Sequence, residues 1–235
     1  STTIDDSTYE VRKNKKVIGV PRDFFENNLD KKMLENFEKA LKKFESLGYK
    51  IKDIKLPHLK YSLAVYYILM PAEVSSNLAR FDGVKYGLHA EGGENSIDDY
   101  FKTRGQGFGR EARRRIILGT YVLSSGYYDA YYGQAQNMKA VITQELREIF
   151  KEVDFILTPT TPTPAFKFGE KSDPLSMYLA DIFTVPANIS GCPSLSLPSG
   201  LVDGLPVGVL LTADLGNENV LFEASKDFEK LEARS

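Results

Sequence analysis

Hydrophobic and polar positions follow each other along the chain in patterns that predict an α/β fold. The apolar run VIGV at 17–20 is typical of a buried strand, and apolar residues then recur at steps of three and four from 30 to 47, as on one face of a helix. Gly48 is placed to end that helix, and the alternation in YKIKDIKL at 49–56 predicts a second, half-exposed strand. Because a helix connects the two strands, we expect them to run parallel in an α/β layer fold.

The rest of the chain predicts further helices and strands around one long loop. Four prolines in TPTTPTPAFKFGEKSDP (158–174) predict an extended loop, and loops of that length are usually functional. Residues 1–16 are polar without periodicity, so we expect a tail or linker there and the folded part at 17–235. Helices are expected at 61–79, at 97–104 with Ser96 as cap, at 109–150 with an interruption around 118–126, near 175–183 and from 217 onward. A loop is expected at 81–96. Strands are expected at 153–159, 194–197 and 206–212, and the last two are joined through SGLVDGLP.

Composition narrows the class of protein. Hydrophobic residues make up 42% and charged residues 26%, as in an ordinary soluble globular protein. The net charge of −2 gives no general attraction to nucleic acid or to an anionic membrane. No apolar run reaches the roughly 18–20 residues of a transmembrane helix, and the start has no apolar core of a secretory signal, so we expect a cytosolic protein with no membrane partner. Because the chain starts without Met in a polar stretch, we also expect a fragment or a processed piece.

Residues for covalent or metal chemistry are scarce. Cys192 is the only cysteine, which excludes an intramolecular disulfide and a Cys-cluster metal site and fits a reducing compartment. Neither His58 nor His89 lies beside it in the sequence, so we expect Cys192 to pack as a small hydrophobic residue. GQGFG at 105–109 is not a phosphate loop, because a helix precedes it. No nucleophile elbow, zinc-protease motif or Walker loop occurs, and no nucleophile–base pair can be assigned.

Charged residues and tyrosines supply the candidate binding groups. Four arginines at 110 and 113–115 cannot share one helix face, so we expect one to point inward, where a guanidinium could hold a carboxylate; the alternative is a solvated basic face paired with Glu111. The tyrosines of 121–132 are expected to pack against helices, with a polar pocket or an interface as the alternative. Asp181 lies in an apolar stretch and must reach solvent or meet a cation. Asn188, Ser190 and Gly191 follow in a turn-prone segment, where backbone amides can approach a substrate.

These same stretches resemble one family. PAEVSSNLARFDGVKYG, TRGQGFGREARRRIILGTYVLSSGYYDAYYGQAQ, TPTTPTPAF, DPLSMYLADIFTVPANISGCPSLSLPSG and LPVGVLL are similar, in the right order from Asp6 onward, to the C-terminal half of the A subunit of glutamyl-tRNA(Gln) amidotransferase. That polypeptide is a glutamine-hydrolysing member of the amidase signature family. The resemblance implies the C-terminal part of an α/β/α sandwich around a mixed β-sheet.

The resemblance also implies which groups the chain has and lacks. The family uses a Ser–cis-Ser–Lys triad in its N-terminal half, and the serine pairs 75–76 and 124–125 lack its flanking glycines and upstream lysine, so no catalytic residue carries over. By motif, Arg115 in RRRIILG would bind the carboxylate of glutamine and Asp181 in MYLADIFT its α-ammonium. Tyr66 in AVYYILM would be the pocket tyrosine, with Tyr67 as the alternative. One cation and one anion suit a free amino acid.

For the whole enzyme, the resemblance implies that ammonia released from glutamine serves transamidation of Glu-tRNA(Gln) to Gln-tRNA(Gln). The amidotransferase subunits B and C would be partners, with tRNA bound mainly through the B subunit, and with ATP and Mg²⁺ on that partner rather than on this chain. The setting would be cytoplasmic, or organellar in a eukaryote. Two alternatives are the C-terminal half of a stand-alone amidase for another small amide, and a non-catalytic assembly module. The non-catalytic assembly module differs from the glutaminase subunit in one observable way: whether the reading frame upstream of Ser1 encodes the serine–serine–lysine segment.

Overall fold

The structure, a computed structural model, describes residues 15–25, 29–170 and 174–232. It divides into two compact units, here called unit 1 (Ser1–Leu63 and Lys139–Ser235) and unit 2 (Ala64–Met138). The predicted tail or linker at 1–16 lies outside the described residues, except for 15 and 16. None of the helices in the described ranges is long and apolar enough to cross a membrane.

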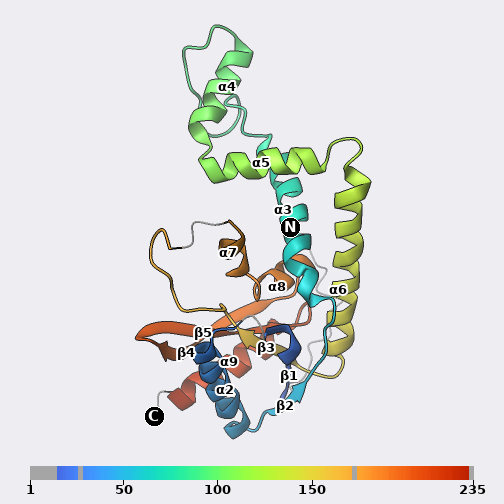
Figure 1. Cartoon of the computed structure of the whole chain (residues 1–235), viewed down its shortest axis with the longest axis vertical. Helices are drawn as coiled ribbons and strands as arrows, with labels where there is room; N and C mark the ends of the chain where they lie inside the picture. The colour runs from blue at the N-terminus through green and yellow to red at the C-terminus, as the bar shows by residue number, and fades with distance from the viewer. Residues whose placement is uncertain (1–14, 26–28, 171–173, 233–235) are drawn as a thin grey trace. The chain divides into compact units, whose positions relative to one another are not determined.

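A mixed five-stranded sheet forms the centre of unit 1 (Figure 1). The predicted α/β class is therefore confirmed, as are the parallel pairing of the first two strands and the strand predicted at 153–159. Strands β2, β1 and β3 run parallel, whereas β5 is antiparallel to both β3 and β4. Across the sheet the order is β2 (Lys50–Asp53), β1 (Val17–Val20), β3 (Phe155–Pro159), β5 (Leu205–Ala213) and β4 (Ser194–Val202).

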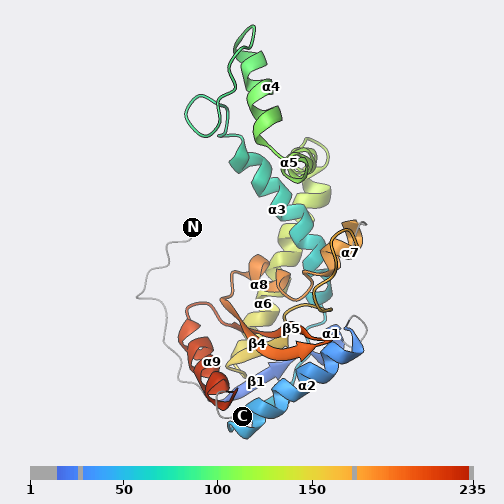
Figure 2. The same ribbon diagram turned by 90° about the vertical axis from the view of Figure 1, so that its left-hand side faces the viewer.

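Helices α2 (Lys31–Ser46) and α9 (Glu218–Glu232) lie on one side of the sheet, and α6 (Gln134–Phe150) and α8 (Val185–Ser190) lie on the other (Figure 2). The core between α2, α9 and the sheet is largely aromatic. Phe44 of α2 is fully buried, with its ring centroid 4.8 Å from that of Phe228 in α9 and 6.0 Å from that of Phe155 in β3. The apolar spacing at 30–47 therefore predicted the helix correctly, because those side chains face this core.

The remaining elements are mostly helices. The predicted helix at 61–79 is confirmed as α3 (Ser62–Leu78), and the predicted helical region at 109–150 consists of α5 (Arg110–Val122), a turn, the π-helix η3 (Tyr128–Gly133) and α6. The interruption expected around 118–126 begins only after Val122, because tertiary packing at Gly119 holds the last turn of α5. The other helices in the described ranges are α1 (Arg22–Phe25), the 3-10 helix η2 (Leu59–Tyr61), α4 (Ser96–Gly107) and α7 (Pro174–Leu179).

Strands β4 and β5 form a tight hairpin that is joined within the predicted segment SGLVDGLP, but the connection is shorter than expected because both strands extend into that segment. Only Asp203 and Gly204 separate the strands, with φ of 52° and 79°. Positive φ at both positions of an Asp-Gly pair is typical of a type I′ hairpin turn, whose twist matches that of the strands. A register shift between Pro198 and Gly200 lets β4 continue beyond its proline.

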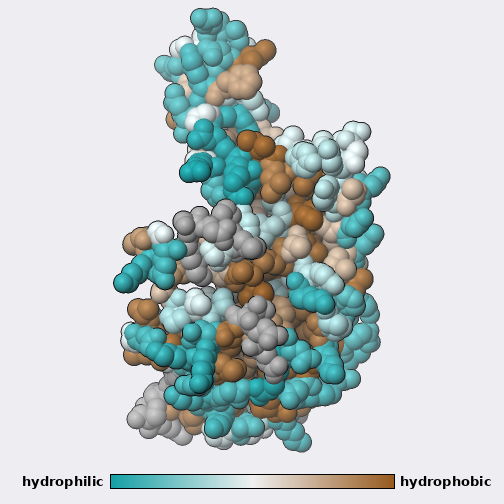
Figure 3. Space-filling model, in the orientation of Figure 1, coloured by the Kyte–Doolittle hydropathy of each residue, from teal (hydrophilic) through white to brown (hydrophobic). Residues whose placement is uncertain are grey.

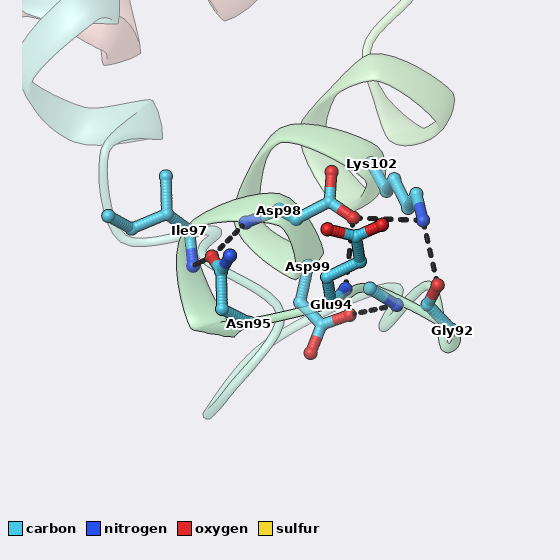
Figure 4. A network of polar contacts seen from close by, with 8 residues as sticks. Gly92, Glu94, Asn95, Ile97, Asp98, Asp99 and Lys102 are labelled. Carbon is cyan, nitrogen blue, oxygen red and sulfur yellow. Dashed lines mark hydrogen bonds and ion pairs between the residues drawn. The ribbon is translucent and has the colours of Figure 1, made fainter.

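Asn95 caps helix α4, and the prediction that Ser96 does so is wrong by one residue. The Asn95 Oδ1 accepts hydrogen bonds from the amides of Ile97 (3.0 Å) and Asp98 (3.1 Å), as Figure 4 shows. Lys102, one turn into the helix, forms an ion pair with Asp98 and donates to the carbonyl of Gly92. The glycine-rich loop predicted at 81–96 is thereby tied to the first turn of α4.

Candidate functional site

The arginine block forms the first part of α5 in unit 2. Arg110, Arg113 and Arg114 are exposed, whereas Arg115 is partly buried, with 32% of its side chain exposed. The expectation that one of the four points inward is therefore confirmed. The helix begins directly after Gly109, and the glycines of 105–107 belong to the end of α4, so GQGFG does not follow a strand.

Contacts from two helices hold Arg115. Its Nε donates to Glu111 Oε1 at 2.7 Å within α5, and its Nη1 lies 3.3 Å from the Met70 sulfur in α3. Partial burial alone would lower the pKa of Arg115, but the hydrogen bond and charge of Glu111, with Tyr66 and Tyr67 nearby, raise that pKa above its usual value. The guanidinium is therefore a fixed cation beside two phenol rings.

Glu111 also binds the neighbouring arginine. Its carboxylate accepts from Arg114 at 2.8 and 2.6 Å, and ion pairing first with Arg114 and then with Arg115 lowers the pKa of Glu111 to about 2. Arg114 is therefore exposed and paired with Glu111, as the alternative of a solvated basic face predicted. Arg115 is paired with Glu111 as well, but it also contacts α3. Met70 is not among the residues predicted from the sequence, although it lies four residues after Tyr66 on the same helix.

Tyr66 and Tyr67 both lie half-buried in α3, with their rings edge to face at 5.3 Å between centroids. Both phenols act on the Arg115 guanidinium electrostatically, so the choice between them as the pocket tyrosine stays open. The five tyrosines near η3 differ from expectation. Four of them, Tyr121, Tyr127, Tyr128 and Tyr131, are 40–47% exposed, so the prediction that they pack against helices is wrong.

The exposed tyrosines stack on one another instead. The Tyr121 and Tyr127 rings lie 4.4 Å apart, and those of Tyr128 and Tyr132 lie 5.0 Å apart. A hydrogen bond with Tyr127 raises the pKa of Tyr121 to about 12. Large apolar side chains of unit 2 are also exposed and interrupt its hydrophilic surface (Figure 3): Val84 at 84%, Ile97 at 68%, Phe101 at 68% and Ile117 at 71%.

Asp181 lies in unit 1, in the turn between α7 and α8, and it is exposed. The short helical piece predicted near 175–183 is present as α7, but this helix ends at Leu179 and the next five residues turn before α8. The neighbours Ile182 and Phe183 are buried in the core, and this places the Asp181 side chain at the surface. Of the two outcomes expected for this acid, it reaches solvent.

The segment after Asp181 is helical, which corrects the turn predicted for Asn188 and Ser190. Asn188 Nδ2 donates to the carbonyl of Thr184 (2.9 Å) and Ser190 Oγ to that of Pro186 (2.8 Å), so both side chains bond back to α8. Gly191 ends the helix with φ of 78°. An open hollow of about 440 Å³ beside α8 is lined by Thr184, Ala187, Asn188, Gly191, Cys192, Ser194 and Leu210.

Three candidate nucleophiles of the described residues, Cys192, Ser75 and Ser124, show no sign of activation. Burial raises the pKa of the Cys192 thiol, which disfavours the reactive thiolate and is consistent with the predicted packing role. Ser75 Oγ donates to the carbonyl of Ala72 (2.8 Å) and Ser124 Oγ to that of Tyr121 (2.7 Å), so the first serine of each pair bonds to the backbone of the preceding turn. The residues predicted to bind glutamine are therefore divided between unit 2 (Tyr66, Arg115) and unit 1 (Asp181), and their common cavity stays a prediction.

Comparisons with known proteins agree in sequence and in structure. A model of the family described as Amidase matches residues 2–222. The A subunit of a glutamyl-tRNA(Gln) amidotransferase from Clostridium botulinum (strain Hall) is 46% identical over 99% of this chain and 50% of its own length. The A 1 subunit of the corresponding enzyme from Clostridium acetobutylicum is 50% identical over 97% of this chain and 48% of its own length.

Among solved structures, the A subunit of glutamyl-tRNA(Gln) amidotransferase from Thermotoga maritima aligns with a TM-score of 0.65 and 40% identity, over 92% of this chain and 41% of that one. The crystal structure of an amidase aligns with a TM-score of 0.72 and 23% identity, over 94% of this chain and 46% of that one, and this likeness concerns the fold alone. The chain thus spans about half the length of the relatives it matches.

Proposed function

The chain belongs to the amidase family, and from that premise we propose that it is the C-terminal half of the glutaminase subunit of a glutamyl-tRNA(Gln) amidotransferase. The observation that carries this proposal is the identity of 46% and 50% to curated A subunits of that enzyme along almost the entire chain. In this proposal, glutamine is hydrolysed to glutamate and ammonia, and the ammonia converts Glu-tRNA(Gln) into Gln-tRNA(Gln).

The chain's own part is recognition of glutamine. Arg115 binds the α-carboxylate, Asp181 binds the α-ammonium, and Tyr66 lines the same pocket. The half-buried, ion-paired guanidinium beside Tyr66 supports this role, because a cation held by two helices loses little freedom when it binds a carboxylate. The exposed carboxylate of Asp181 supports the other half, because it is available to an incoming ammonium. Two opposite charges select a free amino acid over a peptide-linked glutamine.

Catalysis and transamidation belong to other parts of the assembly in this proposal. The Ser–Ser–Lys nucleophile lies in the N-terminal half, so these 235 residues alone release no ammonia from glutamine. The amidotransferase subunits B and C are the partners. The tRNA binds mainly through the B subunit, and ATP and Mg²⁺ bind on that subunit rather than on this chain. The net charge of −2 and the exposed apolar side chains of unit 2 support protein contacts rather than direct RNA binding. The assembly works in the cytoplasm, or in an organelle of a eukaryote.

The test compares two nitrogen donors in the assembled enzyme with a full-length glutaminase subunit. Arg115→Ala and Asp181→Ala are each expected to lower kcat/KM for glutamine-dependent amidation by about 10- to 150-fold, the loss of one charge-assisted hydrogen bond. Amidation with ammonia bypasses the glutamine pocket and is expected to continue at the wild-type rate. Arg113→Ala, an exposed arginine of the same helix, is the matched control and is expected to change neither activity. An equal fall in both activities would instead indicate a folding or assembly role.

A further inference from the structure

Helix α5 crosses α3 within unit 2 at a position where only a glycine fits (Figures 1 and 2). Gly119 is buried, and a Cβ atom there would overlap the carbonyl group of Pro71 and lie 2.9 Å from the Ala72 nitrogen. These neighbours are backbone atoms of a helix, which cannot rotate away as a side chain can. A side chain at Gly119 would therefore push α5 off α3.

Arg115 lies one helical turn before Gly119, on the same face of α5. Its Nη1 contacts Met70, the residue directly before Pro71 on α3. The cation and the glycine thus rest on the same short stretch of α3, residues 70–72. Any displacement of α5 at Gly119 moves the Arg115 guanidinium away from Met70 and from the phenols of Tyr66 and Tyr67.

Glycine inside a helix destabilises it relative to alanine, so Gly119 needs a structural reason. Gly105 in α4 gives the contrast, because a Cβ added there meets no atom within 4 Å. The two glycines are both helical and both in unit 2, but only Gly119 lies at a helix crossing. Gly105→Ala is therefore a matched control for Gly119→Ala.

We propose that Gly119 is a positioning residue for glutamine recognition: its missing side chain sets how closely α5 approaches α3 and thereby places the Arg115 guanidinium. This inference rests on the proposed function, because it assigns Gly119 an effect only through Arg115. Pro71 forms the other side of the contact, because its backbone carbonyl faces Gly119. It is an interior residue of α3, where a proline is a common cause of a kink.

The experiment uses the assembled amidotransferase with its full-length glutaminase subunit and measures kcat/KM for glutamine and for ammonia. Gly119→Ala is expected to lower the glutamine value by about 10- to 100-fold, the loss that a displacement near 1 Å produces, while the ammonia value and the Gly105→Ala control stay at wild type. The double variant Gly119→Ala/Arg115→Ala is expected to equal Arg115→Ala alone, because both changes act on one interaction.

Every other outcome overturns either the proposed function or the positioning role of Gly119. If Arg115→Ala leaves glutamine use unchanged, the proposed function fails and this inference fails with it. If Arg115→Ala impairs glutamine use but Gly119→Ala does not, or the two losses add, only the positioning role is overturned. If Gly119→Ala does not assemble, Pro71→Ala decides. Alanine keeps the carbonyl that faces Gly119, but it restores an amide donor and removes the ring that clashes with the preceding turn of α3. The backbone of residues 70–72, on which Arg115 rests, is therefore expected to shift, which lowers the glutamine value and spares the ammonia value. Unchanged glutamine use in Pro71→Ala then overturns the inference.

Discussion

Replacing Arg115 with lysine is expected to separate the geometry of the guanidinium from its charge. The Arg115 Nε donates to Glu111 and Nη1 lies against the Met70 sulfur, while Nη2 forms no hydrogen bond with any residue that the structure describes. A planar guanidinium can therefore keep its contact with Glu111 and still offer Nη2 to the carboxylate of glutamine. A lysine keeps the charge but lacks the fixed fork of donors.

The expected magnitude follows from losing one charge-assisted hydrogen bond, which is worth about 1.5–3 kcal/mol. Since 1.4 kcal/mol corresponds to about a factor of ten, Arg115→Lys should lower kcat/KM for glutamine by about 10- to 150-fold. The assay is ammonia release from glutamine by the assembled enzyme, with the exposed Arg113→Lys as control. Glutamine hydrolysis by Arg115→Lys within about twofold of wild type would refute the role of the fork. An equal loss in Arg113→Lys would refute its assignment to Arg115.

Three further predictions concern chemistry and stability. The chain of 235 residues alone is expected to release no ammonia from glutamine, because in the proposed function the Ser–Ser–Lys triad lies in the N-terminal half of the subunit. Release by the pure chain above the uncatalysed rate would contradict this. In urea unfolding of the full-length glutaminase subunit, Phe44→Ala is expected to lower the free energy of unfolding by about 3–5 kcal/mol, because Phe44 is fully buried against Phe155 and Phe228. The control Lys42→Ala, at an exposed position of the same helix, is expected to change it by less than about 0.5 kcal/mol. Similar losses in both variants would refute the assignment of Phe44 to the core. The Glu111 carboxylate has a pKa of about 2 in the folded chain against its ordinary 4.5, so its ion pairs stabilise the fold above pH 4.5 and lose that effect as the pH falls from 4.5 to 2. The difference in unfolding free energy between wild type and Glu111→Gln should therefore shrink over that window. A difference independent of pH would contradict the lowered pKa.

Local patterns predicted the elements whose partners lie close in the sequence. The apolar spacing at 30–47 gave α2, because every turn of that helix faces one core, and Gly48 ends it with φ of 86°. Capping was placed one residue late, because Asn95 and Ser96 both have suitable side chains and only the loop geometry decides between them. The hairpin turn at Asp203–Gly204 had a sequence signal that the prediction did not use.

Contacts between distant segments could not be predicted from local patterns. The sequence indicated that one of four arginines turns inward, but the identity of that arginine came from the family resemblance, and its contact with Met70 depends on how α5 crosses α3. The close approach of Gly119 to Pro71 is likewise a contact across many residues. The prediction that the tyrosines of 121–132 pack against helices was wrong for a related reason. The π-helix η3 stacks their rings on one another instead of on a neighbouring helix.

The most direct test of glutamine recognition changes the substrate and the protein together. 4-Aminobutanamide is glutamine without its α-carboxylate, and glutaramate is glutamine without its α-amino group. Wild-type assembled enzyme is expected to hydrolyse both more slowly than glutamine, as measured by kcat/KM for ammonia release. Arg115→Ala should lose its discrimination against 4-aminobutanamide alone, and Asp181→Ala its discrimination against glutaramate alone, because each variant lacks the group that reads the missing charge. Unchanged discrimination in both variants, or the loss of both kinds in either one, would contradict the assignment of Arg115 and Asp181 to the two ends of glutamine.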